Sequence, residues 1–93
     1  MMTLEKLYSL IEKRKRDLPK NSYTTSLFVG GLDRIIQKVG EEAVEVVVAA
    51  KGKSRQRVIE EFADLLFHSL ILLSYLGIKP KEILDELEKR NKT

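Results

Sequence analysis

The sequence contains no cysteine among its 93 residues, which excludes a disulfide scaffold, a thiol nucleophile and any cysteine-ligated zinc or iron–sulfur site. Long apolar runs are also lacking: the run Leu70–Leu73 is far shorter than the roughly 20 residues that span a bilayer. The N-terminal segment is charged from Glu5 onward and lacks the apolar stretch of a signal peptide. We therefore expect a cytoplasmic protein with no membrane partner.

Charge of one sign does not dominate either. The 17 Lys and Arg residues against 14 Asp and Glu give a net charge of +3, well short of the balance of a dedicated nucleic-acid binder. No aromatic residues interleave with the basic run Lys13–Arg16, so no nucleic-acid partner is expected. A hydrophobic share of 43% and a charged share of 33% suit a helix-rich globular protein. The length fits a single domain, residues 1–93, and favours oligomerisation as an additional source of buried surface.

Apolar residues recur every three to four positions along most of the chain, which predicts amphipathic helices. Thr3 is a candidate N-cap, and the first helix should end before Pro19. The polar segment 19–25 is interpreted as a loop, after which Thr24 or Thr25 would cap a short helical turn ending near residue 30. Further helices are expected at about Leu32–Ala50, Arg55–Leu76 and Pro80–Arg90.

The connection Lys51–Lys53 is a tight turn between two helices. Gly52 is expected as the C′ residue of one helix and Ser54 as the N-cap of the next. Val44–Val48 alone would favour a strand, but the helical spacing continues through it. The helix at 55–76 is apolar around most of its circumference, which indicates a partner subunit. The expected fold is all-α: a small bundle of four to five helices around a central antiparallel hairpin, completed by dimerisation.

The acidic residues are concentrated in two short clusters, on the two helices of this hairpin. Glu42 and Glu45 are three positions apart and leave the same helix face, as do Glu61 and Asp64 on the next helix. Both pairs lie at similar distances along the chain from the turn at Gly52. The spacing therefore predicts that the two pairs face one another.

Four carboxylates that converge repel one another strongly unless a cation lies among them. Oxygen ligands, with no cysteine and at most one histidine, select Mg²⁺, for which Mn²⁺ can substitute. Because magnesium shares its ligand shell with phosphates, the implied chemistry is metal-assisted attack on a polyphosphate. The alternative is an ordinary solvated helix face, but acids flanked by apolar residues, as Glu61 and Asp64 are, are costly to bury without a role.

Two further side chains lie one helical turn from these acids. His68 follows Asp64, and it could contact phosphate or be a core histidine hydrogen-bonded to a neighbour. Lys38 precedes Glu42, and it could neutralise a phosphate or form an i,i+4 salt bridge. Both interpretations stay open for each residue.

Two segments, KVGEEAVEVVVAAKG (38–52) and EEFADLLFHSLILL (60–73), resemble the phosphoribosyl-ATP pyrophosphohydrolases of histidine biosynthesis. This family belongs to the all-α nucleotide pyrophosphohydrolases, together with MazG-like proteins. The segment SYTTSLFVGGLDRIIQK (22–38) resembles the part that sets the phosphoribosyl-ATP branch apart. The superfamily pattern E-E-x-x-E followed by E-x-x-D is matched by Glu41, Glu42, Glu45, Glu61 and Asp64.

The resemblance implies a dimeric, magnesium-dependent enzyme that hydrolyses phosphoribosyl-ATP to phosphoribosyl-AMP and pyrophosphate. It implies that Glu41 orients or deprotonates the attacking water. The metal ligands that it implies are Glu42, Glu45, Glu61 and Asp64. The substrate contacts expected are Lys38, His68, Ser22, Tyr23 and Thr24.

Two other functions remain open at this point. A house-cleaning pyrophosphatase acting on non-standard nucleoside triphosphates would use the same chemistry, and only segment 22–38 argues against it. A small basic helical module that binds nucleic acid or a partner helix would show strongly salt-dependent binding and no response to magnesium. The second alternative leaves the acids among apolar residues unexplained.

Overall fold

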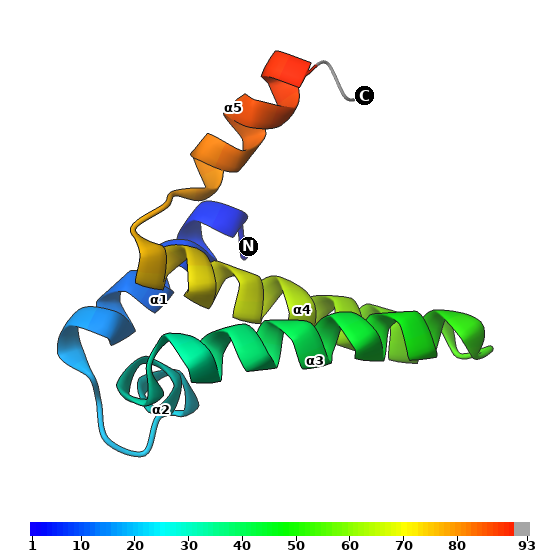
Figure 1. Cartoon of the computed structure of the whole chain (residues 1–93), viewed down its shortest axis with the longest axis horizontal. Helices are drawn as coiled ribbons and strands as arrows, with labels where there is room; N and C mark the ends of the chain where they lie inside the picture. The colour runs from blue at the N-terminus through cyan, green and yellow to red at the C-terminus, as the bar shows by residue number, and fades with distance from the viewer. Residues whose placement is uncertain (91–93) are drawn as a thin grey trace.

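In the computed structural model, which describes residues 1–90, the chain is all-α and folds around a long helical hairpin (Figure 1). The five helices of this part of the chain are α1 (Leu4–Asp17), α2 (Tyr23–Gly30), α3 (Leu32–Lys51), α4 (Arg55–Leu76) and α5 (Pro80–Arg90). The predicted all-α fold with a central antiparallel hairpin is confirmed, because α3 and α4 lie side by side along most of their lengths. Helices α1 and α2 pack at the end away from the hairpin turn.

The first helix begins and ends where its capping residues predict. The Thr3 hydroxyl accepts a hydrogen bond from the Lys6 amide at 3.1 Å, which satisfies one of the free N–H groups of the first turn. The helix ends at Asp17, and Leu18 has a left-handed backbone with φ of 45°. Pro19 then follows, and it cannot continue the helix.

The start of α2 corrects the prediction for segment 19–25. Ser22, not Thr24 or Thr25, is the N-cap, and its hydroxyl accepts from the Thr25 amide at 3.3 Å. The Thr25 hydroxyl donates instead to the Pro19 carbonyl at 2.7 Å. Each threonine was a plausible cap by residue type, but Thr24 is buried and the Thr25 hydroxyl is used in the contact back to Pro19.

The hairpin forms as predicted, with one difference at its turn. Val44–Val48 is helical, and Ser54 caps α4 by accepting from the Arg57 amide at 3.2 Å. Gly52 directly follows the last residue of α3, but its φ of −80° lies outside the left-handed conformation that is common after a helix. Gly77 adopts that conformation, with φ of 73°, after the last residue of α4.

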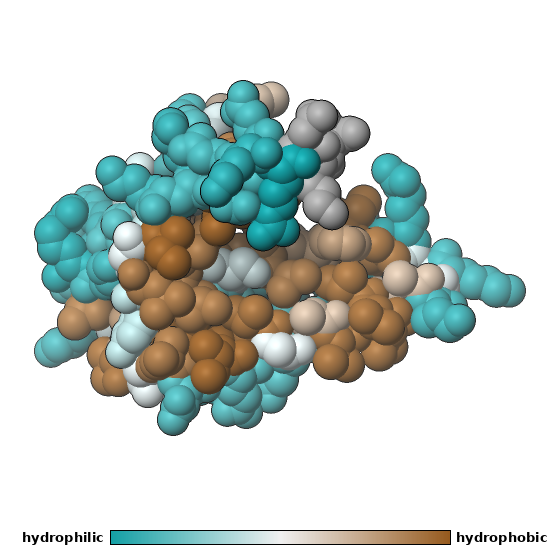
Figure 2. Space-filling model, turned by 45° about the horizontal axis from the view of Figure 1, so that its top comes forward, coloured by the Kyte–Doolittle hydropathy of each residue, from teal (hydrophilic) through white to brown (hydrophobic). Residues whose placement is uncertain are grey.

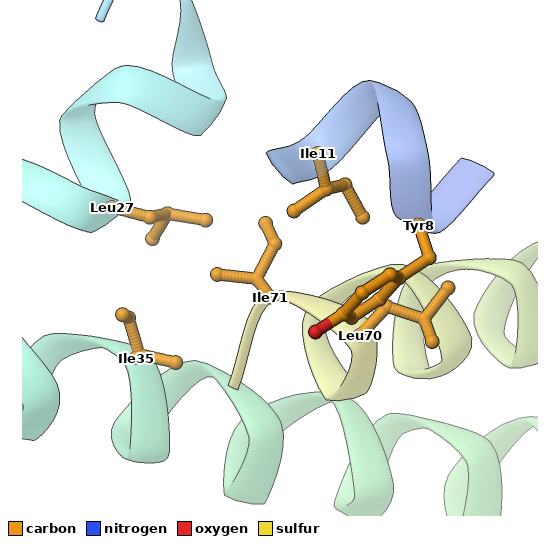
Figure 3. Packing of buried hydrophobic residues seen from close by; sticks show 6 residues of the cluster. All are labelled: Tyr8, Ile11, Leu27, Ile35, Leu70 and Ile71. Carbon is orange, nitrogen blue, oxygen red and sulfur yellow. The ribbon is translucent and has the colours of Figure 1, made fainter. Parts of the chain in front are cut away.

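The core lies where α1, α2 and the far end of the hairpin meet. Ile71 of α4 is fully buried at its centre, and side chains from α1, α2 and α3 surround it (Figure 3). The buried apolar cluster consists of Tyr8, Ile11, Leu27, Ile35, Leu70 and Ile71. This cluster holds α2 against α4, so that the start of α2 lies next to the acid-bearing half of the hairpin.

Helix α5 projects away from the rest of the chain (Figure 1). Its main contact is with α1, and none of its residues is buried. Within residues 1–90, no single helix has both the length and the hydropathy to cross a membrane. Helices α4 and α5 taken together have that length and hydropathy, but they are bent by 101° relative to each other.

Candidate functional site

Three carboxylates from the two hairpin helices meet at one point. Glu42 of α3 and Glu61 and Asp64 of α4 each place an oxygen within 4.8 Å of the other two. The side chains of Glu42 and Glu61 are only 12% and 14% exposed, whereas Asp64 is exposed at the rim. Carboxylates this close and this shielded from water repel one another, because the local dielectric screens them poorly.

The fourth predicted ligand, Glu45, is placed differently. Among the residues that the structure describes, the mutually close carboxylates do not include Glu45. Its side chain is exposed and borders a shallow hollow on α3 together with Glu41 and Gly40. Three of the four acids are therefore brought together within one chain, and a ligand role for Glu45 stays a prediction.

Two cations offset part of this negative charge. The Lys38 ammonium lies 3.3 Å from Glu42 and 3.6 Å from Glu41. Burial lowers the pKa of Lys38, but its hydrogen bond to Glu42 and the neighbouring negative charges outweigh this and raise the pKa overall. The salt bridge that was one of the two interpretations of Lys38 is thus present.

Arg57 is the second cation, and sequence reasoning missed it. Its guanidinium lies 3.4 Å from Glu61, one turn along α4. No role was assigned to Arg57 from the sequence, although its i,i+4 spacing to Glu61 was a signal. The site therefore has two cations on the rim of a larger group of acids.

Glu41 lies outside the three-carboxylate group, on the exposed side of α3. The Gln37 amide donates to its carboxylate at 3.1 Å. That hydrogen bond, together with the charges of Lys38 and Arg34, outweighs desolvation and lowers the pKa of Glu41. An exposed carboxylate accepts hydrogen bonds from water, so this environment suits Glu41 to orient a water molecule.

His68 is buried and uses both ring nitrogens within the chain. It is 5% exposed, with Nδ1 at 2.7 Å from the Asp64 carbonyl and Nε2 at 2.7 Å from the Tyr23 hydroxyl. This is the hydrogen-bonded histidine that the sequence offered as one of two interpretations. The pairing with Tyr23 had no signal in the sequence, because the two residues are 45 positions apart.

The other two residues predicted to contact substrate differ in accessibility. Thr24 is 7% exposed and faces the interior, which leaves little of its surface for a ligand. Ser22 is half-buried as the N-cap of α2, so its hydroxyl has a structural role in addition to any contact with substrate.

A pair of cap variants separates these two roles of Ser22. We expect Ser22→Ala and Ser54→Ala each to lower the free energy of unfolding by about 1 kcal/mol, since each loses one N-cap hydrogen bond. The measurement is urea unfolding of both variants beside the pyrophosphate-release rate. Ser54 is seven residues before Glu61 on the chain and none of its own contacts is with a carboxylate of the site, so a loss of activity in Ser22→Ala alone would assign Ser22 a substrate contact. Equal activity in both variants would leave it as a cap only.

The donor set determines which cation the cluster could hold. Glu42, Glu61 and Asp64 present only carboxylate oxygens, and His68 has no free ring nitrogen to add. Hard oxygen ligands of this type fit Mg²⁺ or Mn²⁺ and do not favour zinc or copper. An excess of acids over cations, open on one side to solvent, is suited to bind a divalent ion together with an anionic substrate.

Comparison with known proteins gives one consistent result. The family model for phosphoribosyl-ATP pyrophosphohydrolase matches residues 4–91. Proteins named phosphoribosyl-ATP pyrophosphatase are similar over nearly the whole chain. That of Leptospira biflexa is 50% identical over 98% of this chain and 99% of its own length. Those of Geotalea daltonii and Geobacter sulfurreducens are 51% and 49% identical over 94% of this chain, and over 82% and 81% of their own lengths. The chain therefore belongs to the phosphoribosyl-ATP pyrophosphohydrolase family.

Proposed function

We propose that this chain hydrolyses phosphoribosyl-ATP to phosphoribosyl-AMP and pyrophosphate, an early step of histidine biosynthesis. The observation that carries the proposal is the family match, which extends from residue 4 to residue 91. The relatives that are about 50% identical to this chain are named phosphoribosyl-ATP pyrophosphatase. The acidic residues of the superfamily pattern lie on the two hairpin helices, which supports this part of the chain as the place of the reaction.

Magnesium is the proposed cofactor, with manganese as a substitute. Glu42, Glu61 and Asp64 would hold it, and Glu45 is proposed as a further ligand reached by a change of side-chain rotamer. When bound, the metal supplies positive charge that stabilises the charge developing on the phosphates. The fit rests on the oxygen-only donor set and on the excess of negative charge that the chain leaves uncompensated.

The chain's own residues supply binding and orientation. Lys38 and Arg57, which now pair with Glu42 and Glu61, can turn to the phosphates once another cation neutralises those acids. Glu41 would accept a hydrogen bond from the attacking water and orient it, while its carboxylate also accepts from Gln37 at 3.1 Å.

A homodimer is the proposed assembly. Between residues 36 and 66, seven large apolar side chains of the hairpin are between 46% and 62% exposed in the single chain: Ile36, Val44, Val47, Val48, Ile59, Phe62 and Leu66. Figure 2 shows apolar residues gathered in a broad surface that extends along the molecule below the polar α5. Contiguous apolar surface of this kind marks an interaction site, and we propose that a second copy covers it. A cytoplasmic location stays a prediction.

The direct test is pyrophosphate release from phosphoribosyl-ATP by the purified chain. We expect turnover with Mg²⁺ or Mn²⁺ and its loss after metal removal with EDTA, because the clustered acids repel both one another and the triphosphate. The comparison is a panel of canonical and modified nucleoside triphosphates under the same conditions. Faster hydrolysis of any of these than of phosphoribosyl-ATP would favour the house-cleaning function, and full activity in EDTA would contradict the metal proposal.

A further inference from the structure

Tyr23, at the start of α2, is joined to α4 through one buried histidine. The Tyr23 hydroxyl lies 2.7 Å from Nε2 of His68, and Nδ1 of the same ring lies 2.7 Å from the Asp64 carbonyl. The Tyr23 ring also stacks on Phe67, with ring centroids 6.4 Å apart and planes at 25°. These contacts fix the phenol beside the turn of α4 that carries the acids.

The direction of each hydrogen bond follows from the chemistry of the groups. A main-chain carbonyl only accepts, so the hydrogen of the neutral imidazole is on Nδ1 of His68 and points to Asp64. Nε2 then has a lone pair, and the Tyr23 hydroxyl must donate to it. A phenol has a single hydrogen, and here it is used inside the protein. The Tyr23 oxygen therefore offers only lone pairs to anything else that approaches.

That oxygen lies near the rim of the candidate site. Tyr23 is 48% exposed, and its hydroxyl is linked through His68 to the main chain of Asp64, whose carboxylate belongs to the three-carboxylate group. Lys38 is itself 3.3 Å from Glu42 of the carboxylate group. A ligand bound at the carboxylates would thus come within reach of the phenol.

We propose that His68 is a positioning residue that turns the Tyr23 hydroxyl into an obligatory hydrogen-bond acceptor for the nucleoside part of the substrate. Phosphate oxygens have lone pairs and no hydrogen to donate at neutral pH, so they are poor partners for this oxygen. The sugar hydroxyls and the amino or imino group of the base can donate to it. This inference rests on the proposed function, and it changes the predicted role of His68 from a phosphate contact to the orientation of Tyr23.

The first test measures the direction of the hydrogen bonds without any substrate. His68 is the single histidine of the chain, so the long-range ¹H–¹⁵N spectrum of its ring is unambiguous. For the neutral ring we expect the hydrogen on Nδ1. A hydrogen on Nε2 would overturn the proposal whatever the enzymatic activity, because Tyr23 would then keep its own hydrogen for a ligand.

The second test uses variants matched to each ring nitrogen, assayed with phosphoribosyl-ATP. Tyr23→Phe removes the phenol oxygen and keeps the stacking on Phe67. His68→Asn retains a donor near Nδ1 and loses the acceptor, whereas His68→Gln can place an oxygen near Nε2. We expect Tyr23→Phe and His68→Asn each to raise KM about tenfold with kcat nearly unchanged, the result of losing about 1.4 kcal/mol of uniform binding.

The same variants give the outcomes that decide the proposal. The double variant Tyr23→Phe, His68→Asn should have a KM no higher than that of either single variant, because both substitutions remove the same interaction. His68→Gln should keep a KM close to that of the wild-type chain. An unchanged KM, a loss confined to kcat, or additive effects would each contradict it. Thermal unfolding of each variant separates misfolding from loss of binding. If the wild-type chain does not hydrolyse phosphoribosyl-ATP, the proposed function is contradicted. The spectroscopic test of the hydrogen-bond direction still applies in that case.

Substrate analogues identify the donor. The KM of Tyr23→Phe is compared with that of the wild-type chain for phosphoribosyl-ATP analogues that each lack one ribose hydroxyl. For the analogue that lacks the partner hydroxyl, the two KM values should be equal. If the tenfold effect persists with every deoxy analogue, the donor is the nitrogen substituent of the base.

Discussion

Asp64→Asn is expected to lower kcat for phosphoribosyl-ATP by at least about 100-fold. Losses of 10- to 100-fold in metal affinity or activity are typical even when a group that only supports a metal ligand is removed, and Asp64 is proposed to bind the metal directly. The change keeps the size and shape of the side chain and removes only its charge. Turnover at saturating Mg²⁺, together with the Mg²⁺ concentration at half-maximal rate, measures the effect.

The matched control is on the same helix. Glu60→Gln neutralises an exposed acid next to Glu61, but the Glu60 carboxylate accepts from Gln56 at 3.2 Å instead of facing the cluster. Its activity should stay within about twofold, whereas Glu61→Gln should lose activity as Asp64→Asn does. Without magnesium, Asp64→Asn should unfold at a temperature no lower than the unchanged chain, because removing one of three close negative charges relieves repulsion. Equal activity of Asp64→Asn and Glu60→Gln would rule out the proposed site.

Phe62→Asp is expected to convert the proposed dimer into monomers. Phe62 is 54% exposed in the single chain, and the proposed second copy would bury it. A carboxylate at the centre of an apolar interface must lose its hydration without gaining a partner. We expect the dimer dissociation constant to rise at least about 30-fold, which corresponds to the roughly 2 kcal/mol lost at an interface hot spot. Sedimentation velocity over a range of protein concentrations gives the mass.

Val29→Asp is the control for this experiment. Val29 is 72% exposed on α2, outside the hairpin, so the same new charge there should leave the mass unchanged. Circular dichroism should show that both variants remain helical. Identical masses for the unchanged chain and Phe62→Asp, whether monomeric or dimeric, would place the contact between copies elsewhere or exclude it.

Much of the fold is predictable from the sequence, because helix boundaries depend on interactions within a few residues. Thr3, Ser54, Gly77 and Pro80 each mark a helix end that the structure confirms. The start of α2 was not predictable, since Ser22 and the two threonines after it are all acceptable caps. The choice depends on the hydrogen bond from Thr25 back to Pro19, a contact that exists only once the loop is folded.

The candidate site divides in the same way. The spacing of the acids on each helix, and hence which of them share a face, is a local property that can be derived from the sequence. Which acids meet across the hairpin depends on how far α3 is rotated about its axis. Residues three positions apart on a helix differ by about 60° in direction, and that difference takes Glu42 into the group and leaves Glu45 exposed.

The sequence by itself determined the helices, the acidic pattern and the family. The tertiary structure alone decided which carboxylates converge and that Tyr23 is bound to His68. The physical reason is that caps and helical spacing act over a few residues of one element. The convergence of side chains is set by the packing of α2, α3 and α4 around Ile71, which depends on all of these elements at once.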